Sequence, residues 1–148
     1  MSSSDTTSPE SGLDYLRRII RDKTWSGMGE TLDISVLEAG DGYAVAQGTP
    51  SERFYNTMMR VHGGFAATLI DTALGCAVMT KLPTMVGYGT VELKVNYVRK
   101  IDVASGPLLA RATVIHAGRT MLTAEAKVAD RSGVLYAHGS GTFLVYPK

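Results

Sequence analysis

The stretch that decides the fold of this chain covers residues 62–79 and reads HGGFAATLIDTALGCAVM. From Phe65 to Met79 it is rich in Ala and Leu and apolar on nearly every side, which predicts a buried helix rather than a strand. Such a helix has to be enclosed by other elements. One group interrupts it, because Asp71 is the only charged residue between Arg60 and Lys81.

Outward from this helix, the hydrophobic pattern predicts one antiparallel sheet. Apolar residues at helical spacing near residues 13–20 predict a short amphipathic helix on the body, and residues 50–61 read as irregular. Alternating runs on either side of Asp41-Gly42 predict a hairpin. The expected strands lie at about 31–38, 42–49, 90–99, 107–116, 120–130 and 134–146. This order predicts an α+β fold with a curved sheet wrapped around the helix. Because one sheet covers only one side, the remaining apolar surface predicts a partner subunit.

Length and composition exclude several classes of protein. The 148 residues suit one domain, expected at 12–148 behind a flexible leader at 1–11. The net charge of +1 gives no sign of the basic surface that is typical of nucleic-acid-binding proteins. No apolar run is long enough to predict a membrane span or a secretory signal, and the single Cys76 indicates a reducing, cytoplasmic compartment. The three histidines lack short ligand spacing, so we expect no metal site.

Two features of the buried helix can carry chemistry. Burying an unpaired carboxylate costs several kcal/mol or more, so Asp71 has either a functional role, a capping role or access to a solvent channel. His62-Gly63-Gly64 places free backbone N–H groups at the helix N-terminus, where they suit an anion or a developing oxyanion, although a Gly-Gly entry can be only a turn.

The spacing of these two features favours a dimer. Gly63 and Asp71 are eight residues apart, which is roughly 12 Å along a helix axis. A reacting carbonyl has to lie about 3 Å from both the oxyanion donor and the attacking group. If both groups act on one substrate, they more plausibly come from two antiparallel helices of a two-fold dimer.

Longer motifs carry a family resemblance. The runs 56–64 (NTMMRVHGG) and 68–75 (TLIDTALG) resemble the hotdog-fold acyl-CoA thioesterases, most closely the PaaI-like family of phenylacetate degradation. The likeness extends over about residues 12–146 and includes ELKVNY at 92–97, HAGR at 116–119 and GSGTF at 139–143. It implies a hotdog fold and a site assembled across a dimer, with a tetramer of two dimers as a further expectation.

The resemblance also implies roles for individual residues. Asp71 matches the catalytic acid, which acts as general base on water or as nucleophile, and Gly63 matches the N–H that polarises the thioester carbonyl. Asn56 matches the residue that helps place the carbonyl or the water, and His62 matches a histidine that sets loop geometry. Thr90 is the nearest candidate for a hydroxyl on the following strand.

The expected substrate is an acyl-CoA with an aromatic, short or medium acyl chain. Arg99 and Arg119 are candidates for phosphate contacts, although each can be a solvated surface charge. Gly64, Met59 and Phe65 flank the motif and are candidates for substrate contacts. The reaction needs no cofactor, because a thiolate leaves readily. A hotdog-fold dehydratase and a non-catalytic acyl-CoA-binding protein are the alternatives.

Overall fold

The computed structural model describes residues 8–146, so the first seven residues of the expected leader lie outside it. Its elements are α1 (Gly12–Asp22), α2 (Met28–Thr31), β1 (Ile34–Gly40), β2 (Tyr43–Gly48), the 3-10 turn η1 (Glu52–Phe54), α3 (Gly63–Met79), β3 (Tyr88–Tyr97), the 3-10 turn η2 (Val103–Ser105), β4 (Leu108–Ala117), β5 (Met121–Asp130) and β6 (Leu135–Val145). In the described part of the chain, no helix is long and apolar enough to cross a membrane.

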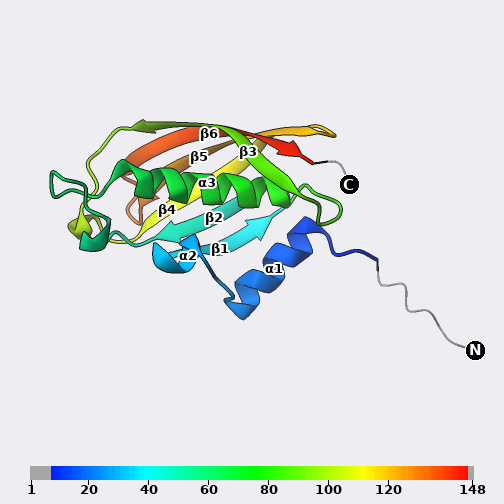
Figure 1. The fold of residues 1–148 in the computed structure, drawn as a ribbon, viewed down its shortest axis with the longest axis horizontal. Helices are drawn as coiled ribbons and strands as arrows, with labels where there is room; N and C mark the ends of the chain where they lie inside the picture. The colour runs from blue at the N-terminus through cyan, green and yellow to red at the C-terminus, as the bar shows by residue number, and fades with distance from the viewer. Residues whose placement is uncertain (1–7, 147–148) are drawn as a thin grey trace, which may run out of the picture.

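The six strands form one antiparallel sheet in the order β1-β2-β4-β5-β6-β3, and α3 lies across one of its faces (Figure 1). This confirms the predicted curved sheet around a long central helix. The two edges of the sheet are β1 and β3. The short helix α2, which the sequence pattern did not predict, precedes β1, so the first strand begins at Ile34 rather than near residue 31.

Small side chains on the sheet let α3 approach it closely. The inner face of β2, β4 and β5 is rich in buried alanines, namely Ala44, Ala46, Ala110, Ala112, Ala124 and Ala126. They pack with the large apolar side chains of α3, of which Leu69, Ile70 and Leu74 are fully buried. The opposite side of α3 is only partly covered, and Asp71 lies there with Gly64, Ala67, Thr68 and Gly75.

A β-bulge in β3 changes which face its residues point to. The alternation of Val91, Leu93, Val95 and Tyr97 predicts that these four residues share one face. In the structure, Val91 is an extra residue between the pairs Thr90–Phe143 and Glu92–Thr142. The bulge therefore puts Thr90 on the same face as Leu93, toward α3, and corrects the predicted phase.

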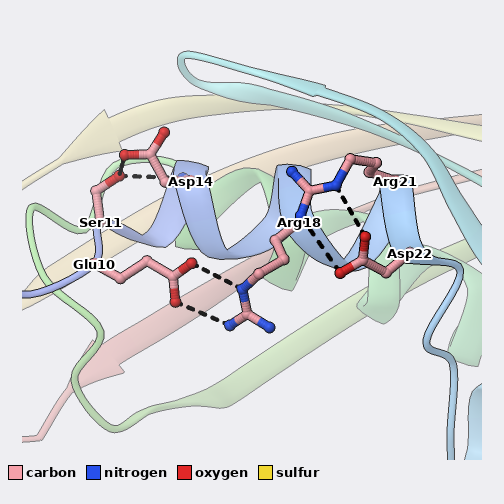
Figure 2. A network of polar contacts seen from close by, with 6 residues as sticks. All are labelled: Glu10, Ser11, Asp14, Arg18, Arg21 and Asp22. Carbon is pink, nitrogen blue, oxygen red and sulfur yellow. Dashed lines mark hydrogen bonds and ion pairs between the residues drawn. The ribbon is translucent and has the colours of Figure 1, made fainter.

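Helix α1 is anchored by polar contacts at its start (Figure 2). The Ser11 hydroxyl accepts a hydrogen bond from the Asp14 N–H at 3.1 Å and so caps the helix. Arg18 donates two hydrogen bonds of 3.0 Å to Glu10, and this guanidinium holds the pKa of the Glu10 carboxyl below its usual value. Glu10 and Ser11, which the sequence places in the leader, thus contact the body.

Gly12 joins α1 to the end of α3. Its N–H donates to the Leu82 carbonyl at 3.0 Å, and a Cβ at this position would lie 1.9 Å from the Met79 carbonyl oxygen. At Gly75 inside α3, by contrast, an added Cβ would meet only Phe143 and Tyr88, at 3.7 and 3.8 Å. The two glycines therefore differ in whether a methyl group fits.

We expect Gly12→Ala to destabilise the fold by about 1–3 kcal/mol, because α1 has to move away from α3. Gly75→Ala is the matched control and should stabilise by about 0.5–1 kcal/mol, since it relieves the entropic cost of a helical glycine. Thermal unfolding monitored by circular dichroism measures both variants. A melting temperature of Gly12→Ala equal to that of the wild type would contradict the close contact.

Candidate active site

Asp71 is held by a hydroxyl from the neighbouring edge strand. Thr90 Oγ1 on β3 donates a hydrogen bond of 2.9 Å to Asp71 Oδ1 on α3. Among residues 8–146, Asp71 makes no ion pair. Hydrogen bonds to a carboxylate are worth about 1.5–3 kcal/mol, so the contact fixes one oxygen and leaves the other available to a ligand or water.

The tip formed by residues 62–64 starts α3. His62 is the N-cap, and its Nδ1 accepts a hydrogen bond of 2.8 Å from the Gly64 N–H. The His62 N–H in turn donates to the Phe54 carbonyl at 2.7 Å. Because Nδ1 is an acceptor, the imidazole is unprotonated there and acts as a cap in this structure. Within the described part of the chain, no acceptor meets the Gly63 N–H, which points out of the helix start.

The side chain of Asn56 organises the loop before this tip. The side-chain Oδ1 accepts from the Met58 N–H at 2.9 Å and from the Arg60 N–H at 3.3 Å, while the backbone N–H of Asn56 donates to the Arg60 carbonyl at 2.7 Å. The loop needs this support, because Met59 has a positive φ of 57°. The amide oxygen is therefore used within the loop, and the Nδ2 group remains as a hydrogen-bond donor.

The strand β3 touches both parts of the site at opposite ends. Thr90, near its start, contacts Asp71, whereas the Tyr97 hydroxyl at its end donates to the Gly63 carbonyl at 3.0 Å. Seven residues of extended chain separate these contacts, which is roughly 20 Å. Within one protomer, the structure therefore does not bring the carboxylate of Asp71 and the amide of Gly63 to a common point.

Two other groups near Asp71 are poor nucleophiles. Burial raises the pKa of the Cys76 thiol to about 12, although part of the residue remains accessible. Burial also raises the pKa of Tyr88, whose hydroxyl donates to the Gly75 carbonyl at 2.9 Å. Both groups stay protonated at neutral pH. The carboxylate of Asp71 is thus the candidate reactive group on this part of α3.

Two clefts meet at the tip. One, the cationic cleft, has a volume of about 430 Å³ and is lined by Asn56, Arg60, Val61, His62, Gly63, Tyr97, Val98, Arg99, Lys100 and Ile101. The other, the aromatic cleft, has a volume of about 390 Å³ and is lined by Met28, Leu32, Arg53, Phe54, Tyr55, His62, Gly64, Phe65 and Thr68. Both share the His62 side chain, and each borders one of the two glycines.

The candidate substrate contacts lie in different places. Only 3% of the surface of Phe65 is exposed, and its ring stacks on that of Phe54 with the ring centroids 5.3 Å apart. Met59 is 74% exposed and lines neither cleft. Arg99 borders the cationic cleft, whereas Arg119 lies in the β4–β5 turn, next to the end of β6, where the Val145 N–H donates to the Thr120 carbonyl at 2.9 Å. The two arginines are therefore not neighbours within one protomer.

Sequence reasoning missed three residues of the site. Tyr97 was expected only as one apolar side chain in a strand, yet it holds the Gly63 carbonyl. Arg60 and the aromatic Tyr55 belong to the segment that reads as irregular, and they line the two clefts. Arg60 lies inside the motif at 56–64 and Tyr55 directly precedes it, and this position is the signal that could have found them.

Comparisons with known proteins identify the superfamily to which this chain belongs. The sequence profile of the thioesterase superfamily matches residues 58–137, and the chain belongs to this superfamily. A protein of Halobacterium salinarum, whose name assigns it provisionally to the esterases, is 38% identical and aligns over 81% of this chain and 85% of its own length. The 1,4-dihydroxy-2-naphthoyl-CoA hydrolase of Listeria monocytogenes is 25% identical over 82% and 98% of the two chains.

The fold has a solved counterpart in the PaaI protein of the E. coli phenylacetic acid degradation operon. The TM-score is 0.78 at 18% sequence identity, with 92% of this chain and 94% of that one covered. Together with the superfamily match, this confirms the predicted PaaI-like hotdog fold.

Replacing Asn56 separates its loop role from its proposed role as a donor. Asn56→Asp keeps an oxygen for the Met58 and Arg60 N–H groups, but it removes the Nδ2 donor and adds a negative charge. We expect the fold to persist and kcat for thioester hydrolysis to fall about 10²–10³-fold. Asn56→Ala should lower both kcat and the melting temperature. Full activity of Asn56→Asp would show that Asn56 supports only the loop.

Proposed function

We propose that this protein is an acyl-CoA thioesterase, which hydrolyses a thioester to a free acid and coenzyme A. The observation that carries the proposal is the pairing of features on α3. A carboxylate held by Thr90 lies on its exposed side, and at its N-terminus lies the Gly63 amide, which meets no acceptor among residues 8–146. Membership of the thioesterase superfamily supports the reaction class.

The proposed reaction uses these two groups and one water molecule. Asp71 takes a proton from the water, whose oxygen adds to the thioester carbonyl carbon. The Gly63 N–H and the dipole of α3 stabilise the resulting oxyanion. When the intermediate collapses, the C–S bond breaks and the CoA thiolate leaves with the electron pair. Direct attack by the Asp71 carboxylate, followed by hydrolysis of the anhydride, uses the same groups. Neither route needs a resident metal or cofactor.

The site becomes complete in a two-fold dimer formed through β3. This ten-residue strand is an edge of the sheet, and its apolar side chains are accessible, with Val91 52% and Tyr97 55% exposed. A long, apolar edge strand is a template for pairing with another chain. An antiparallel pair of β3 strands, related by a two-fold axis, sets the start of one strand against the end of the other.

This pairing brings the separated groups together. Thr90 and its partner Asp71 lie near the start of β3, whereas Tyr97 and Gly63 lie at its end. In the antiparallel dimer, Asp71 of one protomer therefore approaches the partner's Gly63. The exposed side of α3, which one sheet cannot cover, is closed by the same contact. A tetramer of two such dimers and a cytoplasmic location complete the proposal.

The aromatic cleft is the proposed site of the acyl group. It borders Gly64, next to the oxyanion donor, and Phe54, Tyr55 and Phe65 line it. Aromatic side chains favour a flat, apolar acyl group through stacked or edge-to-face contacts. The similar Listeria enzyme is named for an aromatic acyl group, which agrees with this assignment.

Hydrolysis of a panel of aromatic and straight-chain acyl-CoAs, followed by detection of the free thiol, tests the proposal. We expect the wild type to release CoA, and Asp71→Asn to lose at least about 10³-fold in kcat because it cannot accept the proton. The Asp71→Asn side chain still accepts the Thr90 hydrogen bond, so the fold should persist. Wild-type inactivity with the whole panel, or a near-normal rate of Asp71→Asn, would refute the mechanism.

A matched pair of variants tests the amide of Gly63. Gly63→Pro removes the N–H at the first helical position, where proline is favoured, and His62 already has the extended backbone that precedes proline. Gly63→Ala keeps the N–H and adds similar crowding, since its Cβ would lie 3.1 Å from the Tyr97 ring. We expect kcat of Gly63→Pro to be about 10²–10³-fold below that of Gly63→Ala. Equal rates would remove the amide from the mechanism.

A further inference from the structure

The cationic cleft combines an apolar floor with a positively charged rim. Val61 and Ile101, which are largely buried, provide apolar surface, and three cations from two separate segments line the same cleft. Arg60 comes from the loop before α3, and Arg99 and Lys100 follow the end of β3. The side chains of all three residues are exposed to solvent. The cleft borders Gly63, so it opens next to the proposed oxyanion donor.

These three charges are only partly neutralised by the protein. Lys100 forms an ion pair with Asp102 at 3.1 Å, and this ammonium holds the pKa of the Asp102 carboxyl below its usual value. Within residues 8–146, neither Arg60 nor Arg99 forms an ion pair. Like charges that share a cleft repel one another, and a bound polyanion would relieve that repulsion.

One of the arginines is already oriented. Arg99 Nε donates to the Leu135 carbonyl at 3.4 Å, and its guanidinium lies 6.0 Å from the centre of the Tyr136 ring. These contacts restrict the side chain, and within residues 8–146 its two terminal nitrogens make no hydrogen bond. A guanidinium held in this way binds phosphate with less loss of conformational entropy than a free one.

We infer that the cationic cleft binds the phosphate-bearing part of the substrate, with Arg60, Arg99 and Lys100 as its anion-binding side chains. This inference rests on the proposed thioesterase function and names the carrier of the acyl group as free CoA. The apolar floor receives the pantetheine arm that leads away from Gly63, and the cations at the rim meet the phosphates. The residues act on substrate affinity and leave the bond-breaking step to Asp71 and Gly63.

Three carriers of the same acyl group test this inference. The substrates are acyl-CoA, acyl-3′-dephospho-CoA and acyl-pantetheine, which lacks all phosphates. The variants are Arg60→Met, Arg99→Met and Lys100→Met, alone and combined. The control is Arg111→Met, because Arg111 is an exposed arginine on β4 that lies outside the cleft. Circular dichroism shows whether each variant remains folded.

We expect each single variant to raise KM for acyl-CoA about tenfold, in line with one charge-assisted contact, and the triple variant to lose about 10²–10³-fold in kcat/KM. With acyl-pantetheine, the loss of kcat/KM in the triple variant should be at least about 30-fold smaller than its loss with acyl-CoA. The Arg111→Met variant should hydrolyse the thioesters of all three carriers with the kcat/KM of the wild type. Comparing acyl-CoA with the dephospho substrate shows whether the 3′-phosphate or the diphosphate is bound.

Two results would overturn the inference while the proposed function stands. One is a triple variant with wild-type kcat/KM for acyl-CoA, and the other is an equal loss with acyl-CoA and acyl-pantetheine. If the wild type hydrolyses none of the three thioesters, the proposed function itself fails, and the inference fails with it.

Discussion

Helix α3 places the strongest constraint on this structure. It is apolar on nearly every side, so it is stable only where other elements remove it from water. The alanine-lined sheet encloses one side, and the opposite side keeps an exposed stripe that contains Asp71. A carboxylate here costs stability unless it is hydrogen-bonded, and Thr90 from the edge strand provides that bond. The packing of α3 thus positions the carboxylate of Asp71 and leaves part of the helix uncovered, where the proposed second chain would pack.

The edge strand β3 connects the parts of the site. Its start carries Thr90, which orients the carboxylate of Asp71, and its end carries Tyr97, which holds the tip that begins with Gly63. The bulge at Val91 turns the Thr90 side chain toward α3, because without it Thr90 would point to the opposite face of the sheet. The two ends are far apart in one protomer, and the proposed pairing of β3 with the β3 of a second protomer would bring them together.

The sequence predicts the fold better than the details of the site. The apolar run of α3 and the alternating strands were sufficient for the architecture, because periodicity reflects which face is buried. Asp71 was recognisable as the one charge in an apolar helix. The family resemblance singled out Thr90, but the strand pattern did not predict that it faces Asp71, because a bulge depends on pairing between distant strands and leaves no local pattern. The same holds for Tyr97, whose partner lies 34 residues away, and for the loop role of the Asn56 oxygen.

The central claim is that the carboxylate and the amide of one site come from two chains. It is tested most directly by mixing two inactive variants, Asp71→Ala and Gly63→Pro, with different tags to verify subunit exchange. Random assortment makes half of the dimers mixed, and each mixed dimer has one intact site. The account therefore predicts recovery of about a quarter of the wild-type activity. Verified mixed dimers with no more activity than either parent would contradict it, because they would place both groups in a single chain.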